Sequence, residues 1–421
     1  MKKKIEYADE RPISFLDILA ANSKGPERFY WARLAYQLTI IVTQACNMHC
    51  TYCYDKSRVD RELERHELSA EEIVSIIRDA RSFGVRQIKL TGGEVLLKRG
   101  IDQILKACEG AALYLCTNGC FLDSHIAFLK ELSFARLHIH TSIDGLASHQ
   151  KYAKDGITAD ELLAVMRRAK KAMPEAHFSF NTVINVDNVQ ELEAMHLHLA
   201  NDLADKWTIS TPYVVSEVVR NNHPFPDFEE TAIAVARLLQ THFRCGEPFH
   251  LSVGCLYKHE MFDTKTVPLK TPDDHPCLPN CNGARGIIID SFGNILDCLL
   301  ENVEERGTLK DFQTGKFVNL TKTIIGRPFY LMRIADVVQC AECRYVALCG
   351  GGCRYETKAL FGTILNPDPI RCSYYPLMEK HILPVLSQER RRLVESRLNL
   401  SGSIPALRFR NVADILKTFL S

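Results

Sequence analysis

Three closely spaced cysteines are the residues of this chain best suited to chemistry. Cys46, Cys50 and Cys53 form a Cys-x3-Cys-x2-Cys pattern directly after the apolar run Tyr36–Thr43, which predicts a strand. Loops at the carboxyl ends of strands hold the chemistry of α/β enzymes. Three thiolates can hold a [4Fe–4S] cluster and leave one iron open to a ligand. The alternative is one face of a buried helix, because this spacing also places three side chains together on a helix.

A second group of cysteines follows later in the chain. It comprises Cys277, Cys281, Cys298, Cys340, Cys343, Cys349, Cys353 and Cys372. Eight thiolates suffice for two four-iron clusters, since each cluster takes four. Zinc is the alternative, because Cys-x2-Cys pairs also build tetrahedral zinc ribbons. The cysteines at positions 108, 116, 120, 245 and 255 are predicted to be ordinary thiols.

The composition excludes several classes of protein. The 421 residues carry 52 basic and 51 acidic side chains, a net charge of +1, which gives no electrostatic footprint for nucleic acid or an acidic membrane. No apolar signal segment follows Met1–Lys4, and no run reaches the roughly 18 apolar residues of a membrane span. We therefore expect a soluble, cytoplasmic protein whose 16 cysteines do not form a disulfide framework, which leaves metal clusters as the best use for most of them.

Residues 36–210 alternate between short apolar runs and helical patterns. Six strands are predicted, at 36–43, 86–91, 112–116, 137–143, 178–184 and 206–210. Helices are predicted between them, for example from the capping box at Ser69–Glu72 and over Ala159–Ala172. This alternation predicts an α/β fold of parallel βα units, whose ligand loops gather at the carboxyl edge of the sheet.

Polar residues near the strand ends are candidate ligand contacts. Gly92 and Gly93 follow the second strand and would let the backbone approach a ligand, while the carboxylate of Glu94 suits an ammonium group. His138 and His140 alternate on one face of the fourth strand, where a structural or pocket-lining role is favoured over metal binding.

The triplet, with Tyr52 before its last cysteine, resembles the signature of the radical S-adenosylmethionine (radical SAM) superfamily. The resemblance implies a partial, six-stranded TIM-like barrel, written (β/α)6. It also implies that the open iron of the cluster chelates SAM and, when reduced, cleaves it to a 5′-deoxyadenosyl radical. Gly92–Glu94 resembles the Gly-Gly-Glu element that receives the SAM amino group, although Val95 stands where relatives have proline. Further contacts implied near SAM are Thr117, Asn118, Ser142 and Asn181.

The later cysteines resemble the SPASM domain of radical SAM maturases. The implied inner auxiliary [4Fe–4S] cluster uses Cys277, Cys281, Cys298 and Cys353, and the outer one uses Cys340, Cys343, Cys349 and Cys372. Cys255 is the alternative to Cys277 as a ligand. Three clusters are therefore implied in all. In sulfatase-maturing relatives an aspartate follows the cysteine equivalent to Cys298, but Leu299 stands here, which counts against that activity.

The predicted organisation has five parts: an N-terminal arm at 1–35, the radical SAM core at 36–210, a bridge at 211–271 with a helix at Phe228–His242, a SPASM domain at 272–385, and a C-terminal region at 386–421. A β-hairpin from Gly286 to Asp297 is predicted to carry Cys298. One helix is predicted to run on from Cys372 to about Arg397, followed by a tail.

The function implied by the resemblance is hydrogen abstraction from a peptide substrate. Relatives crosslink or otherwise mature ribosomally made natural-product precursors, and a flavodoxin- or ferredoxin-type protein supplies their electrons. The alternatives are a sulfatase-maturing enzyme, a radical dehydrogenase of a sugar or aminocyclitol, and a zinc-ribbon protein that only binds a partner.

Overall fold

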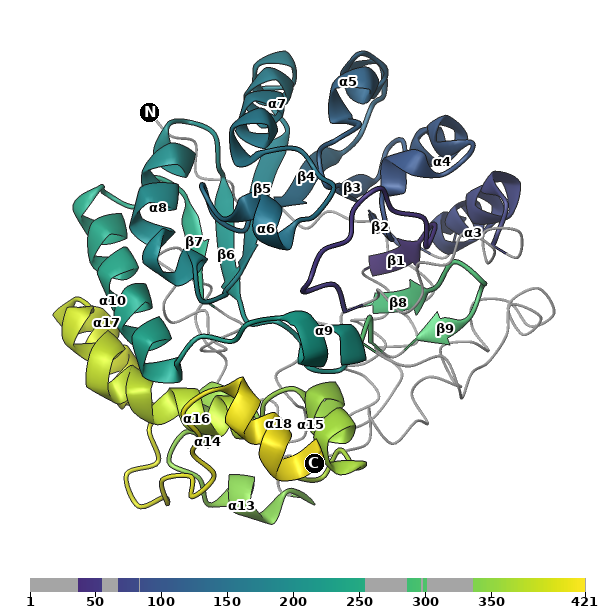
Figure 1. The fold of residues 1–421 in the computed structure, drawn as a ribbon. Helices are drawn as coiled ribbons and strands as arrows, with labels where there is room; N and C mark the ends of the chain where they lie inside the picture. The colour runs from purple at the N-terminus through teal and green to yellow at the C-terminus, as the bar shows by residue number, and fades with distance from the viewer. Residues whose placement is uncertain are drawn as a thin grey trace.

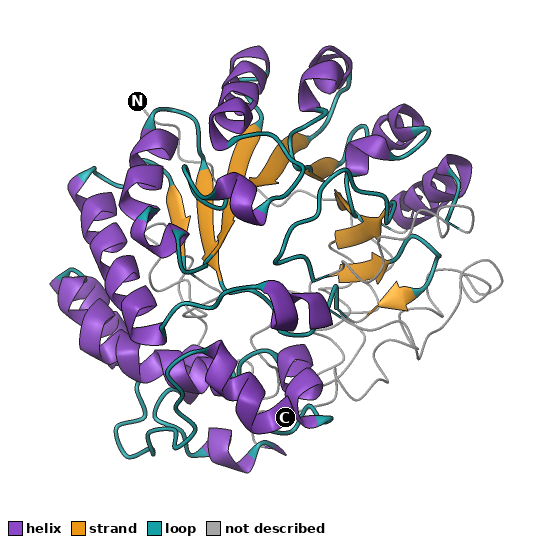
Figure 2. Ribbon diagram, in the orientation of Figure 1, coloured by secondary structure: helices purple, strands orange, loops and turns teal. Residues whose placement is uncertain are grey.

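One curved sheet organises the part of the chain that the computed structural model describes, namely residues 37–54, 67–82, 84–253, 286–296, 298–300 and 336–420. The strand order is β7-β6-β5-β4-β3-β2-β1-β8-β9. The strands follow a curve with the helices outside it (Figures 1 and 2). The predicted N-terminal arm, Cys255, Cys277 and Cys281 lie outside the described residues.

The six predicted strands form the middle of this sheet. They are β1 (Gln37–Ile41), β2 (Gln87–Thr91), β3 (Ala112–Cys116), β4 (Arg136–Ser142), β5 (His177–Val183) and β6 (Lys206–Ser210). Each pairs in parallel with the next strand along the chain. The prediction of a partial (β/α)6 barrel is thus confirmed, and the carboxyl ends of all six strands meet at one edge.

The connecting helices pack on the outside of the barrel. They are α3 (Ala70–Ser82), α4 (Ile101–Ala107), α5 (Leu122–Glu131), α7 (Ala159–Ala172) and α8 (Leu192–Ala200). The predicted capping box opens α3, since the Ser69 amide donates to Glu72 (2.8 Å) and the Glu72 amide donates to Ser69 Oγ (3.2 Å). No helix in the described ranges is long and apolar enough to cross a membrane.

The two faces of the strands differ in chemistry. Ile88 and Leu90 of β2 are fully buried in the hydrophobic core beneath the helices. The alternate residues, Lys89 and Thr91, line a cavity inside the barrel. Barrel interiors are usually filled by branched apolar side chains, so this polar interior is available for a ligand.

The sheet extends beyond the six strands at both edges. β7 (His250–Ser252) pairs in parallel with β6, after α9 (Glu217–Asn222) and α10 (Phe228–Arg244) of the predicted bridge. β8 (Gly286–Ile289) and β9 (Ile295–Leu296) form the predicted hairpin, but β8 also pairs in parallel with β1. The segment leading to Cys298 is therefore part of the barrel sheet, which hydrophobic patterning alone did not indicate.

The C-terminal region departs from the predicted single helix. The chain instead forms α16 (Pro369–Leu377), a π-helix at Met378–Ile382, a 3-10 turn at Leu383–Val385 and α17 (Gln388–Glu395). Pro376 and Pro384 lack the amide hydrogen that a continuous helix needs, and Ser387 caps the new helix α17. The predicted tail contains a further helix, α18 (Val412–Leu420), whose Phe419 ring lies 4.5 Å from Phe361.

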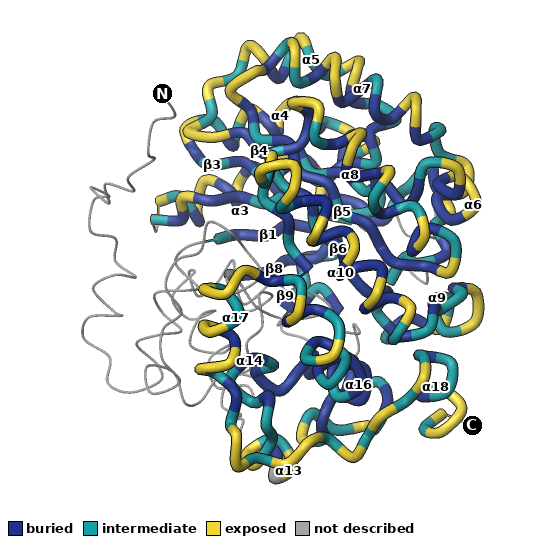
Figure 3. The backbone as a smooth tube through the Cα atoms, turned by 90° about the vertical axis from the view of Figure 1, so that its left-hand side faces the viewer, coloured by how far each residue is buried: buried dark blue, intermediate teal, exposed yellow. Residues whose placement is uncertain are grey.

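Helix α10 joins the barrel to the C-terminal helices. The rings of Phe228 and Tyr374 lie 4.6 Å apart between α10 and α16, and Arg410 forms an ion pair with Asp227 (2.7 Å). Arg390 pairs with Glu247 and its guanidinium lies 4.7 Å from the Phe243 ring. Figure 3 shows buried α16 beneath α10. The two parts therefore share one packed interface.

Candidate active site

The thiol loop at 42–54 leaves the carboxyl end of β1 and is held on both sides by backbone hydrogen bonds. The Gly93 and Glu94 amides donate to the carbonyls of Thr43 (2.9 Å) and Ala45 (2.7 Å). On the other side, the Thr51 amide donates to the Tyr152 carbonyl (2.9 Å). The three thiols are thus presented by a loop that the neighbouring strand ends fix in place.

The glycine pair after β2 is required by this close approach. A β-carbon at Gly93 would lie 2.2 Å from the Ala45 carbonyl oxygen, and one at Gly92 would lie 2.5 Å from that of Thr43. Any side chain at either position would push the thiol loop away, because real β-carbons do not approach backbone oxygens so closely.

Glu94 connects the carboxyl ends of β2 and β3 through its hydrogen bonds. It is fully buried, and its Oε1 accepts hydrogen bonds from the Leu96 amide (3.0 Å) and the Thr117 hydroxyl (2.7 Å). Its Oε2 accepts from the Asn118 amide (2.7 Å), whose side chain in turn donates to Asn47 Oδ1 (2.7 Å). Glu94 therefore positions the β3 turn against the thiol loop, and its contact with a SAM amino group stays a prediction.

A cavity of about 400 Å³ lies beneath the thiol loop, inside the barrel. Of the residues predicted to form the active site, those that line it are Cys46, Cys50, Cys53, Tyr52, Gly92, Gly93, Thr117, Asn118, Ser142 and Asn181. Glu94 is the predicted contact that does not. Sequence reasoning missed Lys89, Cys116 and Leu299 as lining residues, although the two-residue period of β2 and β3 places the first two on the inner face.

Burial sets the protonation of the groups around the thiols. It raises the pKa values of Cys46 and Cys50, so both thiols are neutral near pH 7 until a metal displaces their protons. Burial also raises the pKa of Asp144 to about 7, while hydrogen bonds from the Tyr52 hydroxyl and the Val183 amide (2.8 Å) oppose the rise. A carboxyl group near its midpoint thus lies behind the loop, with Tyr52 between it and Cys50.

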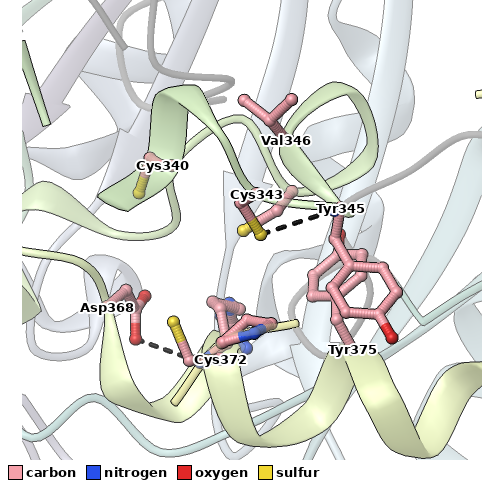
Figure 4. Close-up of a pocket in the computed structure, with 11 residues that line it drawn as sticks. Cys340, Cys343, Tyr345, Val346, Asp368, Cys372 and Tyr375 are labelled. Carbon is pink, nitrogen blue, oxygen red and sulfur yellow. Dashed lines mark hydrogen bonds between the residues drawn. The ribbon is translucent and has the colours of Figure 1, made fainter. Parts of the chain in front are cut away.

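A second thiol site lies in the C-terminal region. Cys340, Cys343, Cys349 and Cys372 line one cavity of about 20 Å³. Figure 4 shows the thiols of Cys340, Cys343 and Cys372 around this shared space. Burial raises the pKa of Cys340 to about 11 and raises that of Cys372 as well.

The backbone around the second site depends on three consecutive glycines. Gly350, Gly351 and Gly352 have φ values of 60°, 81° and 78°, a left-handed conformation that other residues rarely adopt. Asp368 closes this turn, accepting hydrogen bonds from the amides of Cys353 (2.7 Å) and Arg371 (3.1 Å). One carboxylate thereby joins the segment of Cys353 to helix α16.

The remaining predicted ligands are only partly described. Cys298 and Cys353 are both buried, each 7% exposed. Leu299, the next residue after Cys298, lines the cavity beneath the thiol loop. The chain after β9 therefore passes beside the first site before it reaches the C-terminal region.

Comparison with known proteins agrees with this architecture. Residues 40–199, which span β1 to α8, match the radical SAM superfamily model. Residues 40–199 therefore form a radical SAM domain. Its cofactors therefore include SAM and the radical SAM [4Fe–4S] cluster, and the alternative of a zinc-ribbon protein that only binds a partner is excluded as a description of the whole chain.

Relatives by sequence include GTP 3′,8-cyclases. The chain is 26% identical over 280 residues to a probable GTP 3′,8-cyclase of Archaeoglobus fulgidus, covering 65% of this chain and 88% of that protein. It is 31% identical over 169 residues to the probable GTP 3′,8-cyclase of Methanopyrus kandleri, covering 39% of this chain and 52% of that protein.

Solved structures extend the likeness past the barrel. Streptococcus suis SuiB bound to S-adenosylmethionine has a TM-score of 0.61 at 16% identity, covering 84% of each chain. The structure of anSMEcpe with bound AdoMet has a TM-score of 0.61 at 16% identity, covering 86% of this chain and 98% of that one. These likenesses show the fold, and with the described thiols they confirm a radical SAM barrel followed by a cysteine-rich extension of SPASM type.

The side chains beside the second thiol site fit an anionic cluster. Arg354 is 1% exposed, and its Nη1 donates to the carbonyls of Ile364 and Asn366 at 2.8 Å each. Within the described residues its Nε and Nη2 have no hydrogen-bond partner, which is costly for a buried cation. The same charge opposes the rise in the Cys340 pKa, so the guanidinium lies close to the thiols. A four-thiolate cluster bound beside this guanidinium would supply negative charge to balance it.

Proposed function

We propose that this radical SAM enzyme abstracts hydrogen from a peptide and matures a ribosomally made precursor, with two auxiliary clusters assisting. The observation that carries the proposal is the pairing of two thiol sites in one chain: three thiols on a roomy barrel cavity and four around a small one. An active site needs space for cofactor and substrate together, and of these two described sites the first offers it.

In the barrel, Cys46, Cys50 and Cys53 would hold the SAM cluster. When bound there, a reduced cluster together with SAM would supply the chemistry of hydrogen-atom abstraction from the substrate. The chain's own part is positional: Gly92 and Gly93 admit the thiol loop, and Glu94 fixes the β3 turn that carries Thr117 and Asn118. SAM would lie along this edge, in the cavity that Ser142 and Asn181 also line.

In the C-terminal region, Cys340, Cys343, Cys349 and Cys372 would hold the outer auxiliary cluster. Cys298 and Cys353 would belong to the inner one, with Cys277 and Cys281 as the remaining ligands. Auxiliary clusters held there would supply a route for the electron that leaves the substrate. The position of Leu299 on the active-site cavity supports the assignment of its neighbour Cys298 to the inner cluster, because Cys298 then lies beside the place of hydrogen abstraction.

The peptide substrate is supported by the fold. SuiB has also been solved bound to precursor peptide SuiA, with a TM-score of 0.60 at 15% identity, covering 82% of this chain and 79% of that one. A nucleotide is the second candidate, because the relatives by sequence are named GTP 3′,8-cyclases. Leu299 offers no carboxylate as a proton acceptor. Sulfatase maturation is therefore less favoured than maturation of a ribosomally made precursor. A flavodoxin- or ferredoxin-type electron donor and a cytoplasmic location complete the proposal.

Isotope transfer tests the substrate class. Reconstituted enzyme, SAM and dithionite would be incubated either with a deuterated precursor peptide or with deuterated GTP. We expect mass spectrometry to find deuterium in 5′-deoxyadenosine with the peptide and none with GTP. Transfer from GTP alone would replace the peptide proposal with a nucleotide one.

A further inference from the structure

The inner surface of the barrel carries a cation beneath the thiol loop. Lys89 in β2 lines the cavity, together with Cys116 of β3 and His140 of β4. The charge of Lys89 opposes the rise in the Cys116 pKa and, after burial, helps to lower the pKa of His140 to about 3. The charge of Lys89 thus affects the pKa values of both neighbours from within the barrel. His140 is a neutral imidazole near pH 7.

This cation has no counter-charge in the part of the chain that the structure describes. No Asp or Glu side chain lines the cavity there, and none forms an ion pair with the Lys89 amine. The nearest acidic side chain along β2, Glu94, already accepts hydrogen bonds from Leu96, Thr117 and Asn118. An ammonium group on an acid-free cavity wall is a binding site for an anionic group.

The depth of Lys89 separates it from the predicted SAM contacts. It lies three residues before Gly92, which is about 10 Å along a strand and towards the amino end of the barrel. The predicted contacts of SAM follow the ends of β2 and β3 or, as Ser142 and Asn181, lie near the carboxyl ends of β4 and β5. An anionic group that reaches Lys89 therefore belongs to a molecule lying beneath SAM, where the substrate would be.

We propose that Lys89, beside His140, binds a carboxylate of the peptide substrate and thereby fixes the residue to be modified beneath the thiol loop. That the ligand is a peptide rests on the proposed function. That the bound group is anionic rests on the cavity. An acidic side chain next to the reacting residue is the specificity it predicts.

Small ligands test this without knowledge of the precursor. N-acetylglutamate methylamide would be titrated calorimetrically into reconstituted, SAM-loaded enzyme, with the glutamine analogue as neutral control and pyrophosphate as a phosphate probe. We expect saturable binding of the glutamate compound alone. Lys89→Gln should weaken it about tenfold to a hundredfold, the range of a charge-assisted hydrogen bond, while Lys89→Arg retains most of it. Lys130→Gln, at an exposed position on α5, should change nothing.

Other results of these titrations would reject either the carboxylate site or the peptide substrate. Equal binding of the glutamate and glutamine compounds by wild type, or none, rejects the carboxylate site and leaves the isotope result for peptide intact. A Lys89→Gln protein that binds SAM tenfold more weakly shows that the lysine serves SAM instead. Tighter binding of pyrophosphate rejects the carboxylate and counts against a peptide substrate. The wild-type titration decides the matter even if Lys89→Gln folds poorly.

Discussion

The two thiol sites of this molecule differ in the space beside them. The three thiols on the loop after β1 face a cavity of about 400 Å³, whereas the four in the C-terminal region surround about 20 Å³. A metal cluster with three protein ligands beside a large cavity can bind a further molecule. A cluster with four protein ligands and little space beside it cannot. The difference separates a site that can bind and transform from one that can store or pass an electron.

The two sites also differ in what holds them. The thiol loop is positioned by strand ends, through the Gly92–Glu94 turn and the hydrogen bonds of Glu94. The second site is built from short helices, left-handed glycines and the carboxylate of Asp368. The first should therefore keep its shape without metal better than the second, because its frame is the barrel itself.

Removing a ligand of the first site gives the largest expected effect. Cys50→Ser should lose all reductive cleavage of SAM and the iron of one cluster, because the cluster needs all three thiolates. Chromatography of 5′-deoxyadenosine and an iron assay would measure both. Cys245→Ser, at an exposed position after α10, is the matched control and should behave as wild type. Undiminished cleavage by Cys50→Ser would show that these thiols do not hold the SAM cluster.

Removing a ligand of the second site should leave radical formation intact. Cys343→Ala is expected to cleave SAM at a rate near that of wild type yet form little product, since the electron has lost its route. Product formation at the normal rate would show that the second site plays no part in turnover. A protein that unfolds on this change would instead show that the metal holds the helices together.

Changing the charge beside the second site should shift its potential. Arg354→Gln removes a buried positive charge, which makes reduction of the outer cluster harder. The midpoint potential should fall by roughly 60 mV, the one-electron equivalent of a tenfold change in equilibrium constant. Arg354→Lys should restore most of it. An unchanged potential in a redox titration followed by electron paramagnetic resonance would place the guanidinium away from the cluster.

Acid should weaken the barrel before the C-terminal region. Burial lowers the pKa values of His138 and His140 to about 3 and those of His149 and His242 to about 4, so the unfolded chain binds protons that the folded barrel does not. Stability should therefore fall as pH drops from 6.5 towards 4, by roughly 1–2 kcal/mol for a fully buried histidine at pH 5. Protonation of Asp144, whose pKa is raised to about 7, opposes part of this loss.

Hydrogen exchange would locate the effect. Amides of β4 should lose protection between pH 6.5 and pH 5, after correction for intrinsic exchange, while those of α16 lose less. Equal losses in the two regions, or a barrel that grows more stable in acid, would contradict the account of the buried histidines.

Much of the barrel was predictable because its signals are local. The capping box at Ser69 and the apolar runs of β1 to β6 place each element within a few residues. The thiol spacing placed the first site at a strand end, since three cysteines after a strand are specific. Prolines at 376 and 384 were visible in the sequence, yet the single helix predicted across them ignored the amide hydrogens they lack.

Other features depend on contacts between distant segments. The pairing of β8 with β1 joins residues far apart along the chain, and no local pattern specifies it. The connecting role of Glu94 arises because β2 and β3 end side by side. Lys89 was missed for a different reason: its inward position follows from the strand period, but its lack of a counter-charge appears only once the cavity wall is assembled.

If the two thiol sites have the proposed roles, SAM binds at the first thiol site and not at the second. Electron paramagnetic resonance of the reduced protein, with and without SAM, tests it in two variants. In Cys340→Ala/Cys343→Ala the remaining radical SAM cluster signal should change when SAM is added. In Cys46→Ala/Cys50→Ala/Cys53→Ala no signal should respond to SAM, although auxiliary signals remain. A SAM-dependent change in the triple variant, or its loss in the double variant while the first cluster is intact, would contradict the account.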